Sequence, residues 1–259
     1  MEQEPLRLGS ICEQACARIP RMSLSATLRL AAGIAMGASG AAEEAIFESG
    51  GKKIGVEIFR PDVKQRVPAL IVLHGASGAA VGNNYVRQLG VGFASAGYAA
   101  FLVRYFERTG TSYAGDATIY RHYQVWSDTI HDAVTFASAD PLVDAKRVAV
   151  LGYSLGGYLA VTQGARDPRV AAVIEIAGGL DKESPGRAKR MPPTLILHGE
   201  ADQRVLVSEA RALEKWLKKI GATHDVHVYP TEGHLLSVPA ALDALARGHA
   251  FLGKHLLTP

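Results

Sequence analysis

Three residues of this sequence have types and an order that suit nucleophilic catalysis. Ser154 lies in the motif GYSLG, Asp202 follows it by 48 residues, and His234 follows Asp202 by 32. A serine hydroxyl becomes a good nucleophile when a histidine accepts its proton, and an acidic residue keeps that histidine in the required tautomer. The order Ser, Asp, His therefore predicts acyl-transfer chemistry, with Ser154 as nucleophile, His234 as general base and Asp202 as the acid that orients it.

The residues around Ser154 predict a sharp turn between a strand and a helix. Residues 148–151 are uniformly apolar, which is typical of a buried strand, and helical sequence follows the serine. Gly152 and Gly156 complete the pattern G-x-S-x-G, in which the glycines keep side chains from colliding across a strained turn. A glycine-rich turn of this kind can also hold a phosphate, so the motif alone leaves that interpretation open.

Strand-like and helix-like segments alternate along the chain from about residue 46. The sequence predicts strands over 52–61, 68–75, 98–106, 148–151, 170–178, 192–199 and 224–230, and helices over 85–97, 123–139, 207–221 and 240–256. This alternation predicts one α/β domain with a doubly wound, mostly parallel sheet, helices on both faces and no large lid. Parallel strands end at one edge of the sheet, where such folds bind ligands, so Ser154, Asp202 and His234 are expected to meet there.

The remaining site residues are predicted from their place relative to these three. An oxyanion hole needs two backbone N–H groups, and we expect them from Leu155 and from Ala76 in LHGASG, with Ser77 as the next choice. Tyr105 and Arg108, at the end of a predicted strand, are the candidate substrate contacts. Packing or a surface ion pair is the alternative for both.

Other polar residues are interpreted as structural. Glu200 is an alternative to Asp202 as the acid, although it lies closer to the strand end. His74 and His198 are expected to be loop histidines rather than bases. His224 and His227 are three apart on a predicted strand and so face opposite sides, which excludes a shared metal ion. The sequence predicts neither a metal nor a cofactor.

Composition narrows the class of protein. The 259 residues carry a net charge of +3 and are 48% hydrophobic, which is ordinary for a globular protein. The chain has no run of five basic residues and no apolar run of about 18, so neither nucleic-acid binding nor a transmembrane helix is expected. A small molecule is the expected partner, and the oligomeric state is left open. Cys12 and Cys16 cannot cross-link the predicted domain, which spans residues 43–259.

Residues 1–42 form a candidate leader. Arg29 precedes an apolar stretch over 30–36, and small residues then lead to Glu43, a pattern that suits cleavage of a signal peptide before Glu43. This interpretation predicts a periplasmic or secreted protein. Met22 would be the natural start of such a signal, and an alanine-rich helix in a cytoplasmic protein is the alternative.

From about residue 46 to residue 256 the chain resembles the dienelactone hydrolase family of α/β-hydrolases. The resemblance rests on LHGASG, RYFERTG, GYSLGG, HGEADQRV and EGHLLS. It implies a compact sheet of eight strands and hydrolysis of esters or lactones through an acyl-enzyme. The family archetype has a cysteine where this chain has Ser154 and an arginine where it has Val238, so the resemblance implies a serine esterase rather than an enzyme for dienelactone itself. The same three residues would also serve a serine peptidase or an acyltransferase, and a non-catalytic binding protein on this fold is the remaining alternative.

Overall fold

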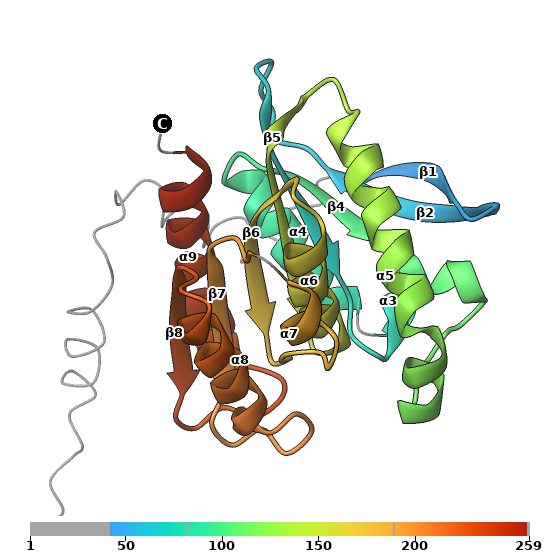
Figure 1. The fold of residues 1–259 in the computed structure, drawn as a ribbon. Coiled ribbons are helices and arrows are strands. Elements are labelled where there is room, and N and C mark those ends of the chain that lie inside the picture. The colour runs from blue at the N-terminus through green and yellow to red at the C-terminus, as the bar shows by residue number, and fades with distance from the viewer. Residues whose placement is uncertain (1–41, 82, 189, 258–259) are drawn as a thin grey trace, which may run out of the picture.

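The computed structural model describes residues 42–81, 83–188 and 190–257 as one layered α/β arrangement (Figure 1). The predicted leader lies outside these residues, apart from Ala42. Eight strands form one sheet in the order β1-β2-β4-β3-β5-β6-β7-β8. They are β1 (Glu43–Ser49), β2 (Lys52–Phe59), β3 (Val67–Leu73), β4 (Ala99–Val103), β5 (Val143–Tyr153), β6 (Val170–Ile176), β7 (Thr194–Gly199) and β8 (His224–Tyr229).

The sheet confirms the predicted doubly wound, mostly parallel topology. Neighbouring strands from β4 to β8 are parallel, whereas β2 is antiparallel to both β1 and β4. Strand β1 was not predicted, because it is an exposed edge strand in which only Phe47 and Ser49 are buried. A segment that buries so few side chains has little of the apolar alternation by which strands are identified in a sequence.

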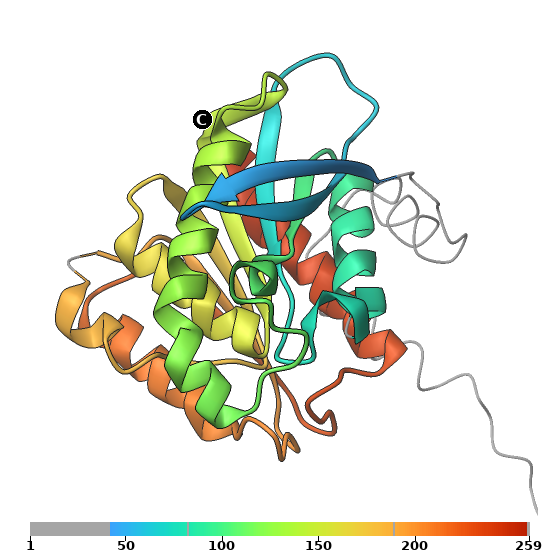
Figure 2. The same ribbon diagram turned by 90° about the vertical axis from the view of Figure 1, so that its right-hand side faces the viewer.

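Helices cover both faces of the sheet (Figure 2). Their bounds are α3 (Gly78–Val81), α4 (Asn83–Ser95), α5 (Asp116–Ser138), α6 (Leu155–Arg166), α7 (Ser184–Arg187), α8 (Val207–Lys219) and α9 (Val238–Leu252), with a 3₁₀ turn η1 (Tyr105–Thr109) and a final π-helical turn η2 (Gly253–Leu257). Helices α5, α6 and α8 pack in one apolar core and α4 and α9 in the other. The fully buried strand β3 and the apolar second half of β5 separate these two cores, as expected of strands buried on both faces.

Helix α5 begins seven residues before the predicted start at Tyr123. Its extra turns begin after Gly115, which has extended backbone angles, and place the acidic Asp116 in the first turn, where the helix dipole favours a negative charge. The first turns are largely exposed, and Tyr120 keeps 92% of its surface accessible. They therefore lack the apolar periodicity that identified the rest of the helix.

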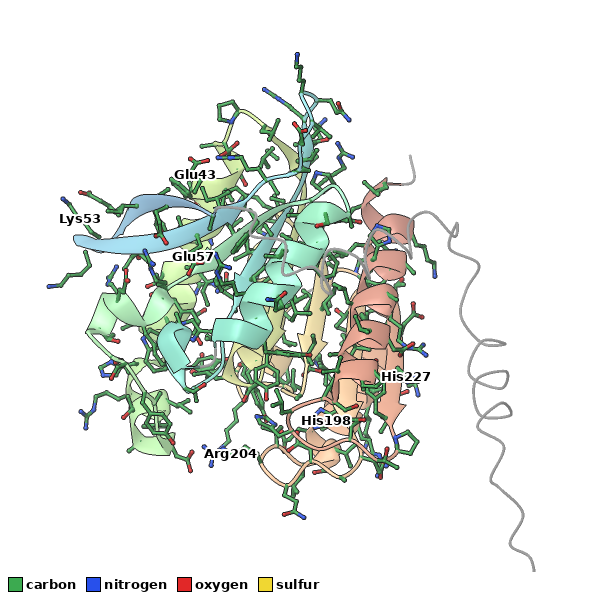
Figure 3. All side chains as sticks on the ribbon, turned by 180° about the vertical axis from the view of Figure 1, so that it is seen from behind. Glu43, Lys53, Glu57, His198, Arg204 and His227 are labelled. Atoms are coloured by element: carbon green, nitrogen blue, oxygen red, sulfur yellow. The ribbon has the colours of Figure 1, made fainter. Side chains whose placement is uncertain are left out.

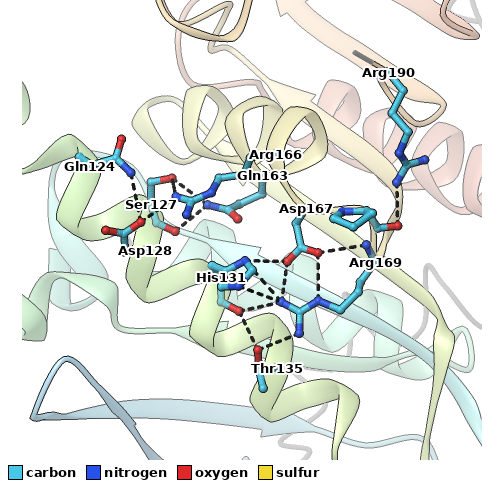
Figure 4. A network of polar contacts seen from close by, with 11 residues as sticks. Gln124, Ser127, Asp128, His131, Thr135, Gln163, Arg166, Asp167, Arg169 and Arg190 are labelled. Atoms are coloured by element: carbon cyan, nitrogen blue, oxygen red, sulfur yellow. Dashed lines mark hydrogen bonds and ion pairs between the residues drawn. The ribbon is translucent and has the colours of Figure 1, made fainter. Parts of the chain in front are cut away.

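A polar network fixes the C-terminal end of α6 against α5 (Figure 4). The buried Asp167 carboxylate binds the Arg169 guanidinium at 2.7 Å and the His131 imidazole at 2.9 Å. Burial raises the pKa of Asp167, but hydrogen bonds from the side chain and backbone of Arg169 outweigh it and hold that pKa below its usual range. Arg166, the residue before Asp167, binds Asp128 of α5 at 2.8 Å, one turn before His131. The helix that follows Ser154 is thus anchored at its far end.

None of the helices in residues 42–81, 83–188 and 190–257 is long and apolar enough to cross a membrane. In the same part of the chain, no three His, Cys, Asp or Glu side chains are grouped so that they could hold a metal ion.

Candidate active site

Ser154 occupies a strained turn between β5 and α6. Its backbone angles are φ 58° and ψ −122°, a region that residues with side chains rarely adopt. The adjacent glycines allow this turn, because a Cβ on Gly152 would lie 1.9 Å from the carbonyl oxygen of Gly156. A Cβ on Gly156 would in turn lie 2.5 Å from the carbonyl oxygen of Leu73. The motif GYSLG thus has the close packing that its two glycines predicted.

The structure brings Ser154, His234 and Asp202 into one hydrogen-bonded chain. His234 Nε2 lies 2.9 Å from Ser154 Oγ, and His234 Nδ1 lies 2.7 Å from Asp202 Oδ2. A carboxylate only accepts hydrogen bonds, so Nδ1 carries the proton and Nε2 presents its lone pair to the serine. The Asp202 side chain is fully buried and that of His234 is 23% exposed. This arrangement can remove the hydroxyl proton as Ser154 attacks a carbonyl.

Hydrogen bonds from two backbone N–H groups and a contact with His198 orient the Asp202 carboxylate. Asp202 Oδ1 accepts hydrogen bonds from the backbone N–H groups of Arg204 at 2.8 Å and Val205 at 2.9 Å. His198 Nε2 binds the carbonyl oxygen of Val205 at 2.8 Å and lies 3.4 Å from Asp202 Oδ2. Figure 3 shows His198 and Arg204 at the edge where the parallel strands end. His198 is therefore structural, as predicted, but it supports the acid directly.

Tyr153, the residue before the nucleophile, holds the loop that carries His234. Its hydroxyl donates a hydrogen bond to the carbonyl oxygen of His234 at 3.0 Å, and the two rings lie 5.2 Å apart. Burial raises the pKa of Tyr153 to about 12, so the hydroxyl remains a donor at neutral pH. The imidazole is thus positioned both by Asp202 and by a contact from the strand that ends at Ser154.

Replacing Tyr153 with phenylalanine should lower kcat by roughly three- to tenfold and leave KM nearly unchanged. The change removes one hydrogen bond, worth about 0.5–1.5 kcal/mol, and keeps the ring. Tyr98→Phe is the matched control, because the buried Tyr98 hydroxyl has no partner among the described residues. Steady-state kinetics of both variants measure the effect. Equal kcat values for the two variants would contradict a role for the Tyr153 hydroxyl.

Two backbone amides are available to bind an oxyanion. The N–H of Leu155 begins α6 and that of Ala76 follows β3, and neither donates a hydrogen bond to any described residue. The loop that carries Ala76 is held by its own carbonyl oxygen, which accepts from Ala114 N at 2.8 Å. It also packs closely against the nucleophile, because a Cβ on Gly75 would lie 3.2 Å from the Cβ of Ser154. Ser154 N is already occupied by the carbonyl oxygen of Ile176. The two predicted amides are therefore free beside the serine.

The prediction that Tyr105 contacts substrate is wrong. Its side chain is fully buried, donates a hydrogen bond to the carbonyl oxygen of His74 at 2.7 Å and stacks on the His74 ring at 4.1 Å. His74 is itself buried, which lowers its pKa to about 4, and its Nδ1 lies 2.8 Å from the carbonyl oxygen of Gly75. Both side chains thus support the loop before Ala76, and His74 is structural, as expected.

The prediction for Arg108 is also wrong. Its guanidinium donates to Ser49 Oγ at 2.8 Å at the turn between β1 and β2, and Ser49 donates to Asp132. Arg108 does not line the cleft at Ser154. The alternative acid Glu200 is excluded as well, because its carboxylate binds Arg211 at 2.7 Å rather than His234.

A cleft of about 730 Å³ opens beside Ser154. Its walls come from the first turns of α5, the start of α6, the loop after β6, and the segment from the β7–α8 loop into α8. The lining includes Ala76, Asp116, Ile119, Tyr120, Tyr123, Gln124, Ser154, Leu155, Tyr158, Leu180, Asp181, Lys182, Glu183, Arg204, Val205, Leu206 and Glu209. Apolar and charged side chains share this surface.

Most of these lining residues were not identified from the sequence. Tyr158 lies one helical turn after Ser154, so the helical spacing of four could have placed it beside the nucleophile. Its hydroxyl lies 3.3 Å from Glu209 Oε2. The first turns of α5, residues 116–122, precede the predicted helix over 123–139, so their helical face could not be identified. Three residues of these turns, Asp116, Ile119 and Tyr120, line the cleft.

Residues 54–243 match the sequence profile of the dienelactone hydrolase family. Among solved structures, a dienelactone hydrolase-like promiscuous phosphotriesterase from metagenomic libraries is 17% identical, with a TM-score of 0.72, over 83% of this chain and 98% of that chain. The acylaminoacyl peptidase of Pyrococcus horikoshii is 16% identical, with a TM-score of 0.66, over 83% of this chain and 42% of that chain.

Matches to curated proteins cover only part of each protein. The acylamino-acid-releasing enzyme 1 of Oryza sativa subsp. japonica is 26% identical over 219 residues, which are 66% of this chain and 28% of the relative. The chain spans less than a third of the length of this relative and of the polyketide transferase of Penicillium sp and the thiohydrolase of Arthrinium phaeospermum that it also matches.

Proposed function

Since the chain belongs to the dienelactone hydrolase family, a family of hydrolases, we propose that it is a serine hydrolase that cleaves small carboxylic esters or lactones through an acyl-enzyme. The observation that carries this proposal is the hydrogen-bonded chain from Ser154 Oγ to His234 and on to Asp202. Nucleophile, base and acid each lie at hydrogen-bond distance in the order that the chemistry requires.

The reaction follows from this geometry. Ser154 Oγ attacks the ester carbonyl carbon while its proton passes to His234 Nε2, and Asp202 stabilises the imidazolium that forms. The N–H groups of Leu155 and Ala76 bind the oxygen that becomes negative. The intermediate collapses, and His234 gives the proton to the leaving alkoxide. Water then attacks the acyl-enzyme with His234 again as base, which releases the acid and restores Ser154.

The rims of the cleft favour small acyl groups. Tyr120 is 92% exposed and Leu206 is 59% exposed, so the apolar rims lie largely in water and cannot enclose a long chain. A fully buried methylene would contribute about 0.8 kcal/mol, or roughly a fourfold gain per carbon. An open cleft forgoes most of that gain.

Across p-nitrophenyl esters from acetate to decanoate, kcat/KM should therefore be highest for acyl groups of two to four carbons, by analogy with open pockets. The series is measured with background hydrolysis subtracted by use of Ser154→Ala. A maximum at eight carbons or beyond would show that the cleft encloses a chain and would contradict the open-site account.

A serine peptidase is the second candidate, since the chain resembles acylaminoacyl peptidases in both comparisons. The same three side chains can cleave an amide, and an acyltransferase differs only in using an alcohol or amine in place of water. Turnover of activated esters and simple lactones against aminoacyl p-nitroanilides separates these cases. Preferred cleavage of the anilides would replace the esterase proposal with a peptidase, and product esters formed with an added alcohol would indicate a transferase.

A further inference from the structure

Glu175 is a buried carboxyl group that the proposed reaction does not use. It lies near the end of β6, level with Gly152 of β5 and Ile196 of β7, and its side chain is fully buried. Its Oε1 accepts a hydrogen bond from the N–H of Gly178. Its Oε2 is buried and has no partner in the part of the chain that the structure describes. A charge in this position would be unpaired and costly.

The turn that Glu175 holds packs directly against the nucleophile. Ala177 has a φ of 53°, and among the described residues only Ala177 and Ser154 combine a positive φ with a side chain. A Cβ on Gly178 would lie 2.8 Å from the carbonyl oxygen of Ser154 and 2.9 Å from Glu175 Oε1. Gly178 is therefore wedged between the serine backbone and the carboxyl group. The N–H of Ser154 is fixed by the same turn, through the carbonyl oxygen of Ile176.

The first turn of α6 contacts the carboxyl from the other side. A Cβ on Gly157 would lie 3.2 Å from Glu175 Oε1 and 3.2 Å from the Cα of Gly178. Helix α6 begins with the Leu155 N–H that is proposed to bind the oxyanion. The carboxyl thus lies beneath the backbone that supplies both the nucleophile and one oxyanion donor.

We propose that Glu175 is a positioning residue for Ser154. The protonated Glu175 side chain holds the Ala177–Gly178 turn against the nucleophile, and ionisation of Glu175 lowers turnover at alkaline pH. This inference rests on the proposed serine chemistry. An ionised Glu175 would oppose the positive field at the start of α6 that stabilises the oxyanion. Ionisation would also place a charge without an ionic partner in the core, directly against the backbone of Gly178 and Ser154.

The surroundings of Glu175 favour its protonated form at neutral pH. Burial raises its pKa to about 8, against the lowering effect of the Gly178 N–H, and the negative charge of Asp202 raises it further. Tyr158 of α6 is the other titratable group that interacts with it, and Glu209 of α8 contacts Tyr158. The level residues of β5 and β7 carry no charge.

Two substitutions test this role by activity. Glu175→Gln keeps an oxygen that can accept from Gly178 N but cannot ionise, so kcat at pH 7 should stay within about threefold of the wild type. Its kcat/KM should be higher than that of the wild type above pH 8, where the wild type declines. Glu175→Ala removes the hydrogen bond and leaves a void, and its kcat should fall by about tenfold or more at every pH.

Glu57→Gln is the matched control, because Glu57 is also a buried glutamate. It lies on β2, away from the edge that carries Ser154, and its carboxylate binds Arg87 of α4 at 2.9 Å. It should leave the alkaline decline unchanged. The same alkaline decline in Glu175→Gln as in the wild type, or full activity of Glu175→Ala, would overturn the proposed role of Glu175.

A stability measurement tests the protonation state without using activity. The pKa of Glu175 is higher in the folded protein than its ordinary value of 4.5, so the folded state holds an extra proton between pH 4.5 and about 8. The unfolding free energy of the wild type must lose this contribution as pH rises through that window. The Tm of Glu175→Gln minus that of the wild type should therefore increase from pH 5 to pH 8, and a constant difference would refute the protonated state.

These outcomes separate the two proposals. If the wild type turns over esters and Glu175→Gln shows the same alkaline decline, only the inference about Glu175 is refuted. A wild type without turnover refutes the proposed function and with it the positioning role, while the Tm comparison still decides whether Glu175 is protonated.

Discussion

Replacement of Ser154 by alanine is expected to lower kcat for an activated ester by about 10⁴-fold or more. The substitution removes only the hydroxyl group, and no other hydroxyl lies within hydrogen-bond distance of the His234 imidazole among the residues that the structure describes. Alanine tolerates the φ of 58° about as well as serine, because neither side chain is branched at Cβ. The expected loss is therefore chemical rather than structural. Steady-state kinetics with p-nitrophenyl acetate measure it.

An unchanged Tm and circular dichroism spectrum of Ser154→Ala would show that the fold persists. Retention of more than about a tenth of wild-type activity in such a folded variant would mean that another group is the nucleophile.

Replacement of Asp202 by asparagine is expected to lower kcat by roughly 10³- to 10⁴-fold. Asp202 Oδ1 accepts from the N–H groups of Arg204 and Val205, so the carbonyl oxygen of the new amide must stay at that position. The amide NH₂ then faces His234 Nδ1. That nitrogen can pair with NH₂ only as an acceptor, which moves the imidazole proton to Nε2 and removes the base that faces Ser154.

Glu200→Gln is the control for Asp202→Asn. Glu200 lies two residues earlier but binds Arg211 at the surface, so its replacement should change kcat by less than about twofold. A pH–rate profile of Asp202→Asn adds a second readout, because hydroxide can take the Ser154 proton in place of His234, so activity should rise with pH in the alkaline range. Equal activity of the two variants would exclude Asp202 as the orienting acid.

The sequence predicted the fold and the three central residues because the relevant signals are local or ordered along the chain. The apolar run before Ser154, the glycines around it and the strands before Asp202 and His234 each occupy a few residues. Parallel topology then places the ends of these strands at one edge. No knowledge of side-chain contacts was needed for this step.

The predictions that Tyr105 and Arg108 contact substrate failed because the predicted strand extends past the true end of β4. Residues 98–106 read as one continuous strand, but β4 ends at Val103 and η1 follows at once. The 3₁₀ turn directs Tyr105 into the core beneath His74, whereas a continued strand would have carried it to the sheet edge. Boundaries of this kind depend on packing that a single sequence does not display.

The supporting residues could not be predicted from the sequence, because their contacts join distant parts of the chain. Tyr153 reaches His234 across 81 residues, and Glu175 reaches the nucleophile only through the register of β5 with β6. His198 is four residues from Asp202, yet its contact depends on the path of the loop between them. Such contacts follow from the three-dimensional arrangement rather than from any pattern in the sequence.

The central claim is that Ser154 is a nucleophile activated by His234, and covalent labelling by a fluorophosphonate tests it most directly. Attack of Ser154 Oγ on the phosphorus would expel fluoride and leave one phosphonyl group on the protein. Intact-mass and peptide mass spectrometry should find a single adduct on Ser154 in the wild type, none in Ser154→Ala, and labelling slowed by at least about 10³-fold in His234→Ala. An unlabelled wild type, or an adduct that forms at the same rate in Ser154→Ala, would contradict the account.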